Sequence, residues 1–543
     1  MPLLLLQRVL LSEQSKVFVR TASGLVRTIS PWGALGMAVV MPGILNTLFL
    51  GEWGAGLFPN AYEPASNAAI VLLLPVMAVF YLFSVAMPRS GGDYMYVSRT
   101  LTPVLGMVTS WTFSVVYWTW CGLNNVLAFQ YGPAVDLVAR GEMSGNQAMI
   151  NQGLFIMSDP WTLWVGSVLL ALLAGFIVWR GTKLTMITFY TILVISLIGL
   201  IAMVYAWLSM PSPTFFQANL LKMTGVSYQS IITKAQANGW TSGFAMMPTL
   251  YAGVTYVMLN TLGNQGVVTV AGEVKEVKKS AFFALFGSLA LMVVFWLPQY
   301  LMLYEVGGRE FTSASAYLFM NGLNPLPIEP VWTYLTAIAS NNPTLTTIVT
   351  YSFVASDWAV GFGGLYFSTR AIFAWGFDRV FPSFANKVNS RGVPVGAVTI
   401  ATIGCVIWTT LQVWFPQYLR LIGYTTCVWA LAWVILGIAA IVFPWKRKEI
   451  FLKSPDIVRR KIAGLPVITI MGILTVIISL YIAWATFVPA ISGNNVLYTF
   501  YPFVTTVLIL MLIPVGIFYG YYYYRTKVGK VRMDIQFKEI PPD

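Results

Sequence analysis

The segment that decides the fold is TISPWGALGMAVVMPGILNTLFL, residues 28–50. It is apolar over about the 20 residues that a membrane-spanning helix needs. Met41-Pro42-Gly43 falls near its middle. Proline removes one backbone hydrogen bond and clashes with the preceding turn, and glycine removes conformational restraint. The segment therefore predicts a membrane helix that is interrupted near its midpoint.

The composition of the whole chain also indicates an integral membrane protein. Of 543 residues, 57% are hydrophobic and 9% are charged, whereas about 25% of a soluble domain is charged. So few charges exclude an ordinary cytosolic enzyme, a disordered protein and a nucleic-acid binder. The chain has no histidine, which excludes histidine acid–base chemistry and histidine metal ligation. Cys121, Cys405 and Cys427 lie in long apolar stretches and are interpreted as core residues.

Continuously apolar runs of spanning length predict an all-α protein with twelve transmembrane helices. Backbone polar groups have no water partners in lipid, so such runs must be helical. The expected spans are 28–50, 67–87, 104–130, 161–179, 184–208, 244–272, 281–304, 344–369, 394–415, 421–444, 465–490 and 497–524.

The basic residues predict the orientation. With a cytoplasmic N-terminus, all but five of the 32 lysines and arginines fall in inner segments; the five are Arg140, Lys222, Lys234, Arg309 and Arg420. The positive-inside rule then places both termini in the cytoplasm, and we expect a multi-pass protein of the plasma membrane. The net charge of +13 is thereby explained without a nucleic-acid partner.

A second interrupted span is expected in GFAMMPTLYAGVTYVMLNTLGNQGVVTVAG, residues 243–272, where 260–266 are polar and flanked by glycine. Taken singly, each interruption could be a kink packed on small residues. Together they occupy matching positions, helices 1 and 6, of a five-plus-five inverted repeat. Interrupted helices in corresponding places of two repeats are the best sequence pointer to a transporter's binding site.

The chemistry of broken helices suits an amino acid. Free N–H groups at a helix start bind a carboxylate, and free C=O groups at a helix end bind an ammonium group or cation. We expect Thr261 and Gly263 carbonyls to take the amine, while Asn264 and Gln265 either read a polar side chain or cap the helix. The aromatic residues Tyr117 and Trp118 are candidates for the pocket wall. The backbone groups expected at the carboxylate belong to Met41, Pro42, Gly43 and Ile44.

Three motifs resemble one known family. They are PRSGGDYMYVSRTLTPVLG (88–106), AGEVKEVKKS (271–280) and STRAIFAWGFDRVFPSFANKVNSRGVPVGAV (368–398). By these motifs the chain resembles the amino acid–polyamine–organocation (APC) transporters, and within them the basic amino-acid permeases. The resemblance implies a leucine-transporter-type fold and an amino acid permease, coupled to a cation or a proton, that works by alternating access. The alternatives are a polyamine or small-amine transporter or exchanger of the same fold, and a non-transporting membrane sensor or subunit.

The chain departs from the family pattern at two places that matter for binding and coupling. Pro42 stands in the first break and lacks an N–H, so one carboxylate donor is missing. Ser196 stands near the position where many proton-coupled members carry a lysine in helix 5. These departures bear on the substrate and the coupling ion, and they leave the transport class unchanged.

The loop after helix 2 carries charges that can form a gate on the inner side. Arg89, Asp93 and Arg99 can pair with Glu273 or Asp378 at the cytoplasmic ends of other helices. The alternative is that these residues are solvated loop charges that follow the positive-inside rule.

A single charged side chain, Asp357 near the middle of helix 8, lies within the twelve expected spans. A carboxylate there costs about 2.5–3.5 kcal/mol on insertion scales, so it needs a cation, a proton or a buried donor. Ser352 and Ser356 are four residues apart and share a helix face. We expect Asp357, Ser356 and Ser352 to couple transport to Na⁺ or H⁺, against the alternative of an aspartate that only fixes helix packing.

The expected organisation is one transport unit with short polar ends. The chain offers no acid cluster or metal constellation inside the membrane, so we expect no enzyme activity, no metal and no cofactor beyond the coupling ion. The expected partners are an amino acid or small amine and the lipid bilayer, with the oligomeric state open.

Long outer connections at 131–160, 209–243 and 305–343 should contain short helices over the outer mouth. The expected segments are a cytoplasmic N-terminus (1–27), a core of helices 1–10 (28–445), a basic cytoplasmic loop (446–464), helices 11–12 (465–524) and a cytoplasmic tail (525–543).

Overall fold

The computed structural model describes residue 25, residues 27–415, 421–487 and 500–529, and residues 533 and 537. Most of the expected N-terminal segment 1–27, and most of the expected tail 525–543, lie outside the described residues.

Nearly all described residues are helical, which confirms the all-α class. The strands of the described part are β1 (Lys461–Ile462) and β2 (Leu465–Pro466), which form a small antiparallel hairpin. The first helices are α2 (Pro31–Val40), α3 (Thr47–Leu57), α4 (Glu63–Ser66), η1 (Asn67–Leu73), α5 (Leu74–Ala86), α6 (Gly92–Thr100), α7 (Pro103–Tyr131), α8 (Pro133–Ser144), α9 (Gln147–Ser158), α10 (Pro160–Arg180), α11 (Thr182–Leu208), α12 (Pro213–Thr224) and α13 (Tyr228–Ala237). The next are α14 (Met246–Ala252), η2 (Gly253–Val257), α15 (Met258–Thr261), η3 (Asn264–Glu273), α16 (Val277–Phe282), η4 (Phe283–Gly287), α17 (Ser288–Leu301), η5 (Met302–Gly308), α18 (Arg309–Met320), α19 (Trp332–Ser340) and α20 (Pro343–Phe377). The last are η6 (Ser383–Asn386), α21 (Val395–Trp414), α22 (Leu421–Lys446), α23 (Lys448–Lys453), α24 (Asp456–Arg459), α25 (Val467–Phe487), α27 (Phe500–Tyr523) and η8 (Tyr524–Val528).

Seven helices in the described part of the chain are long and apolar enough to cross a membrane. The helices α7 and α20, of 29 and 35 residues, are not among the seven but are also long enough to span. The count of twelve spans and the inverted repeat stay predictions. The seven are Glu63–Ala86, Pro160–Arg180, Thr182–Leu208, Val277–Met320, Val395–Trp414, Thr425–Lys446 and Val467–Thr486.

Four helices begin with the same local signal, a capping side chain followed by proline. The cap oxygen accepts a free N–H of the first turn, and proline at the first helical position gives up a donor that has no helical partner. The strongest case is α20, where Asn342 Oδ1 accepts from the N–H groups of Thr344 and Leu345, at 2.9 and 3.1 Å. The other pairs are Ser30-Pro31, Thr102-Pro103 and Asp159-Pro160.

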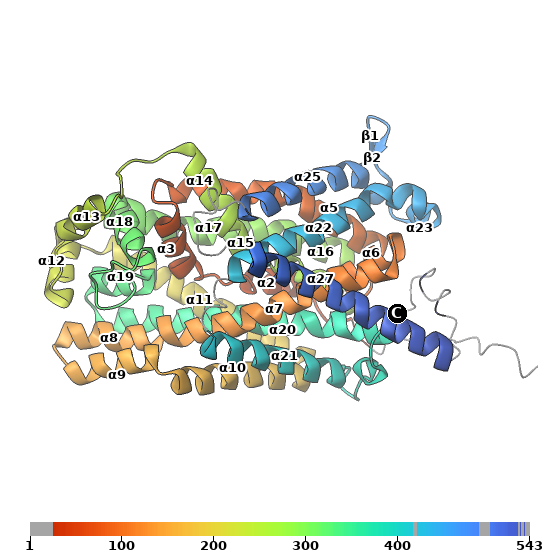
Figure 1. Cartoon of the computed structure of the whole chain (residues 1–543), viewed down its shortest axis with the longest axis horizontal. Helices are drawn as coiled ribbons and strands as arrows, with labels where there is room; N and C mark the ends of the chain where they lie inside the picture. The colour runs from red at the N-terminus through yellow and green to blue at the C-terminus, as the bar shows by residue number, and fades with distance from the viewer. Residues whose placement is uncertain are drawn as a thin grey trace, which may run out of the picture.

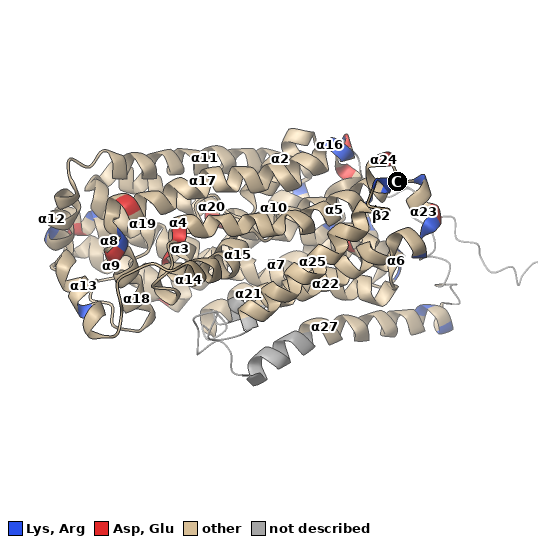
Figure 2. Cartoon of the chain, turned by 90° about the horizontal axis from the view of Figure 1, so that it is seen from above, with Lys and Arg blue, Asp and Glu red and all other residues tan. Residues whose placement is uncertain are grey.

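The helices form an elongated bundle whose two ends differ (Figure 1). The basic end carries α16, α23 and α24, where lysines and arginines gather (Figure 2). The opposite end, called the loop end below, carries α8, α9, α12, α13, α18 and α19. The long connections therefore contain short helices, as expected. Few charged residues lie along the middle of the bundle (Figure 2), as a membrane-embedded region requires.

The centre of the bundle is the packing of α20 against α7. Gly361 and Gly364 of α20 lie directly against α7. A Cβ at Gly361 would be 3.1 Å from Cys121 Cα, and one at Gly364 would be 3.0 Å from Tyr117 Cβ. Small residues at such a crossing let helix backbones approach closely. This approach brings the middle of α20, including Asp357, next to α7 and to the break in helix 1.

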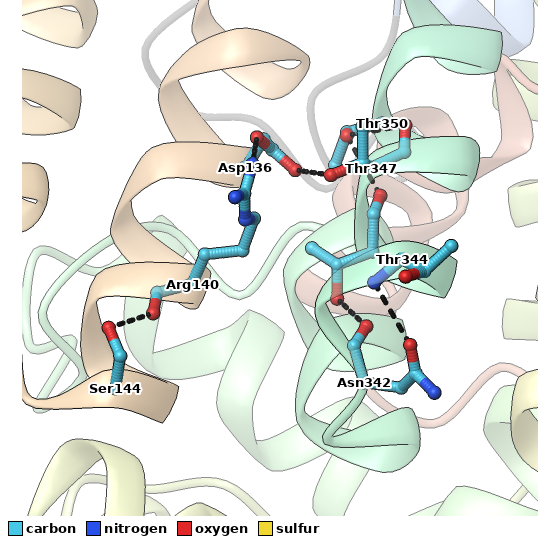
Figure 3. A network of polar contacts seen from close by, with 8 residues as sticks. Asp136, Arg140, Ser144, Asn342, Thr344, Thr347 and Thr350 are labelled. Atoms are coloured by element: carbon cyan, nitrogen blue, oxygen red, sulfur yellow. Dashed lines mark hydrogen bonds and ion pairs between the residues drawn. The ribbon is translucent and has the colours of Figure 1, made fainter.

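A polar network fixes the loop end of α20 to α8 (Figure 3). The Thr347 hydroxyl donates to Asp136 Oδ1 at 2.7 Å, and Arg140 Nη1 pairs with Asp136 Oδ2 at 3.2 Å. Asp136 is buried, so its charge is compensated by one cation and one hydroxyl. This network holds α20, which carries Asp357, in place against α8.

Candidate functional site

The first helix is broken where the proline and glycine predict. Helix α2 ends at Val40 and α3 begins at Thr47. Gly43 has φ +82°, a conformation that side-chain-bearing residues rarely adopt. Its N–H donates to Val40 O at 3.0 Å, and no hydrogen bond involves the Ile44 N–H within the described residues. The break therefore leaves one backbone donor available.

The sixth helix is also broken. Helix α15 ends at Thr261, Gly263 has φ +105°, and the chain continues as the 3-10 helix η3 from Asn264. The Gly263 N–H donates to the side-chain oxygen of Gln265 at 3.2 Å. Gln265 thus caps the second half of the broken helix, which is one of its two expected roles.

The two breaks lie against each other. A Cβ at Gly263 would overlap Met41 Sδ, so glycine is needed for this approach. Beside the contact is a small cavity of about 30 Å³, roughly the volume of one water molecule. All of its lining residues are buried. They are Pro42, Asn46, Phe49, Leu50, Trp120, Leu123, Asn124, Leu259, Asn260, Leu262 and Val360.

Three asparagines give this apolar cavity its polar groups. Asn46 Nδ2 donates to Asn124 Oδ1 at 3.2 Å, and Asn124 Nδ2 donates to Trp120 O at 2.8 Å. Neither polar atom of Asn260 has a hydrogen-bond partner among the described residues, although Asn260 is 4% exposed. An unpartnered buried amide is costly, so Asn260 and the free oxygen of Asn46 are the cavity's available hydrogen-bonding groups.

Sequence reasoning did not single out these asparagines. Asn260 entered the prediction only as part of the polar stretch 260–266, Asn46 and Asn124 were not named, and no local motif connects the three positions. They could have been found by asking which amide side chains lie within the expected spans, because a polar group in a membrane helix is costly and usually has a function. Trp120, which stacks on Trp429 at 4.9 Å between ring centroids, was also missed.

The expected substrate residues are distributed unevenly around the cavity. Pro42 lines it, and Met41 packs between Gly263 and Gly363. Thr261 Oγ1 donates to the carbonyls of Val257 and Met258 within its own helix. Asn264 Nδ2 donates to Ser288 Oγ at 3.1 Å, so this amide bonds to α17.

The two aromatic residues expected at the pocket wall differ in their surroundings. The Tyr117 hydroxyl lies against Gly266, just after the second break. The Trp118 indole instead donates to Ser368 and packs on Gly404 of α21. Neither residue lines the cavity.

Asp357 and Ser356 both contact the segment that follows the first break. The Ser356 hydroxyl accepts from the Leu45 N–H at 2.8 Å. Asp357 is fully buried beside the amide of Asn46, but neither carboxylate oxygen receives a hydrogen bond of ordinary geometry from a described residue. Ser352 faces Gly199 of α11. Two of the three expected coupling residues therefore contact the broken helix directly.

Two buried ion pairs lie toward the basic end of the bundle. Arg99 Nη1 and Nη2 bind the Asp378 carboxylate at 2.5 and 2.9 Å. Arg370 Nε and Nη2 bind the Glu273 carboxylate at 2.7 and 3.0 Å. The Arg99–Asp378 pair agrees with the expected gate, whereas Glu273 takes Arg370 and no residue of the loop after helix 2. Asp93 is buried, and no ion pair to it occurs in the described part of the chain.

Comparison with known proteins places these features in a family. The amino acid permease family model matches residues 65–513. A branched-chain amino acid permease, BcaP, from Lactococcus lactis is 22% identical over 365 residues, covering 65% of this chain and 69% of that protein. A probable amino-acid permease, meu22, from Schizosaccharomyces pombe is 24% identical over 441 residues, covering 77% and 68%. With two broken helices around a buried cavity, and a family model matched over most of its length, the chain belongs to the amino acid permease family and is a membrane transporter of amino acids, not an enzyme.

Proposed function

We propose that this permease carries a neutral amino acid with an apolar side chain across the plasma membrane by alternating access, and that Asp357 couples the movement to a cation or proton gradient. The observation that carries the proposal is the buried cavity at the contact of the two breaks. Its fold is proposed to be the five-plus-five inverted repeat of twelve spans.

The lining of the cavity supports the class of substrate. An α-amino acid needs donors for its carboxylate and acceptors for its ammonium group, which the Asn46 and Asn260 side chains of the lining offer. The rest of the lining is aliphatic or aromatic, and no lining residue is charged. A polyamine would bring two or more charges into this apolar space, which disfavours that alternative.

The size of the cavity indicates that this conformation has no room for a substrate. About 30 Å³ holds a water molecule but no amino acid, so binding requires the lining side chains to move apart. The basic end is proposed to be cytoplasmic by the positive-inside rule. The Arg99–Asp378 and Arg370–Glu273 pairs are then the inner gate, because they bridge α6 and η3 to α20.

Coupling is proposed to pass through the segment after the first break. Leu45 contacts Ser356, and Asn46 lies beside Asp357 and also lines the cavity. A proton on Asp357, or Na⁺ bound by Asp357 and Ser356, would neutralise the buried carboxylate. Movement of Asn46 by substrate would change the environment of that charge.

Uptake into proteoliposomes tests the proposal. Labelled leucine and valine, with lysine and putrescine as charged comparisons, are measured under an inward pH gradient and separately under an inward Na⁺ gradient. We expect uptake of the aliphatic amino acids only, and at least a tenfold loss of their affinity in Asn260→Ala. Asn219→Ala is the control, since Asn219 is 5% exposed but lies in α12, outside the cavity. Uptake of neither putrescine nor any of the 20 amino acids, each measured in the same way, would favour a non-transporting sensor, and uptake of putrescine alone would favour an amine transporter.

A further inference from the structure

Two carboxyl groups meet near the loop end, away from the cavity and from Asp357. Glu52 belongs to α3, the second half of the broken helix, and Glu329 belongs to the connection between α18 and α19. Glu329 Oε1 accepts from the Trp53 indole at 3.0 Å, and Oε2 accepts from the Tyr131 hydroxyl at 2.6 Å. The Glu52 carboxyl lies against that of Glu329.

Glu52 itself receives no hydrogen bond. It is 1% exposed, and neither of its carboxylate oxygens has a donor among the described residues. An unpartnered charge in such a place is expensive, whereas a protonated carboxyl group would need an acceptor, which Glu329 supplies. Glu329 already accepts two hydrogen bonds, one on each oxygen, as an ionised carboxylate does.

The surrounding charges do not compensate a second negative group. The polar groups facing the pair are the Trp53 indole of α3, the Tyr131 hydroxyl of α7 and the Glu63 carboxyl of α4, with Asp357 of α20 beyond Tyr131. No lysine or arginine forms an ion pair with Glu52 or Glu329 in the described ranges. Two adjoining buried carboxylates with no cation cannot both be ionised. Burial also raises the pKa of Glu329, although hydrogen bonds from Glu52, Tyr131 and Trp53 oppose this effect.

We propose that Glu52 is a proton-binding site, holding a proton that it donates in a hydrogen bond to the Glu329 carboxylate, so that one proton fastens α3 to the α18–α19 connection. Loss of the proton places two negative charges side by side and separates these elements at the loop end. The site is distinct from the coupling group Asp357, and it does not depend on which substrate is carried or on whether transport occurs.

Infrared difference spectroscopy of the whole protein in lipid tests the proposal without transport. The probe is the C=O stretching band of a protonated carboxylic acid, followed from acid to alkaline pH. We expect Glu52→Gln to remove one such band, and Glu329→Gln to shift it to higher frequency because the charged acceptor is gone. Glu305→Gln is the control: Glu305 pairs with Arg309 at 2.6 Å and is ionised, so no band should change.

The pH dependence of thermal stability gives a second measurement. A carboxyl group that is protonated only in the folded state contributes stability at low pH, and this contribution is lost as pH rises through its folded-state pKa. The amide of Glu52→Gln can donate the same hydrogen bond without titrating, so the fall in Tm with rising pH should flatten in this variant and persist in Glu305→Gln. If Glu52→Gln does not fold, the proposal is tested by Glu329→Gln alone, in which the C=O band should shift to higher frequency. Bands unchanged in both variants, or an unchanged pH slope in a folded Glu52→Gln protein, would overturn the proposal.

Discussion

Replacing Arg370 by methionine should destabilise the protein far more than the same change at an exposed arginine. Arg370 and Glu273 are 1% and 2% exposed and are joined by two hydrogen bonds. The guanidinium also lies 4.2 Å from the ring centre of Tyr366. Removing one partner of a buried pair leaves an uncompensated charge and costs about 3–5 kcal/mol. In Arg370→Met, Glu273 keeps only the Thr182 hydroxyl, at 3.0 Å.

The assay is the free energy of unfolding in detergent, measured in a double-mutant cycle. Arg370→Met and Glu273→Gln should each be costly, and the double variant should recover much of the loss because no charge stays buried alone. Arg309→Met is the control: Arg309 and Glu305 are 49% and 35% exposed, and such pairs contribute less than about 1 kcal/mol. If Arg370→Met lowers the free energy of unfolding no more than Arg309→Met does, the Arg370–Glu273 ion pair does not stabilise the protein as a buried pair should.

Three further predictions concern coupling, binding and pH. Asp357→Asn should abolish gradient-driven uptake while substrate still raises the thermal stability; normal accumulation against a gradient would contradict the coupling role. Gly263→Ala should weaken substrate binding in a radioligand assay, because its Cβ overlaps Met41 and an alanine in the left-handed region costs about 1–2 kcal/mol. Gly225→Ala, at φ +73° with open space around it, carries only the backbone cost and should bind normally. Burial raises the pKa of Asp93 to about 8. The contribution of Asp93 to the free energy of unfolding should therefore fall as pH rises from about 4 to 8, by roughly 1.4 kcal/mol per unit of pKa shift. Asp93→Asn does not titrate, so thermal scans of this variant at several pH values should lack the fall that Asp93 causes.

The breaks could be predicted from the sequence because their causes are local. Proline and glycine act on the backbone of their own turn, so Pro42, Gly43 and Gly263 mark the interruptions without any tertiary information. The cavity could not be predicted in this way. Asn46, Asn124 and Asn260 come from three separate segments and converge only when the bundle packs, so the polar stretch at 260–266 did not point to the other two asparagines.

The ion pairs at the basic end could also be predicted only in part from the sequence. Their members are charged and lie at the ends of spans, so a gate there was predictable from residue type. The pairing depends on helix packing and was predicted in part: Arg99 takes Asp378, as expected, but Glu273 takes Arg370. Arg370 lies in the C-terminal part of α20. In the sequence it is one more basic residue of an expected cytoplasmic segment, so its ion pair with Glu273 could not be predicted.

The break in helix 1 removes backbone hydrogen bonds, and side chains from two other helices replace some of them. Gln299 of α17 donates to Ile44 O at 2.8 Å, and Ser356 of α20 accepts from Leu45 N–H at 2.8 Å. Asn124 of α7 holds the side chain of the next residue, accepting from Asn46 Nδ2 at 3.2 Å. The same short segment borders the cavity on one side and Asp357 on the other. A ligand that displaces Asn46 must therefore change the contacts of Asp357. By thermodynamic linkage, a cation or proton at Asp357 must then change the affinity of the cavity by the same factor.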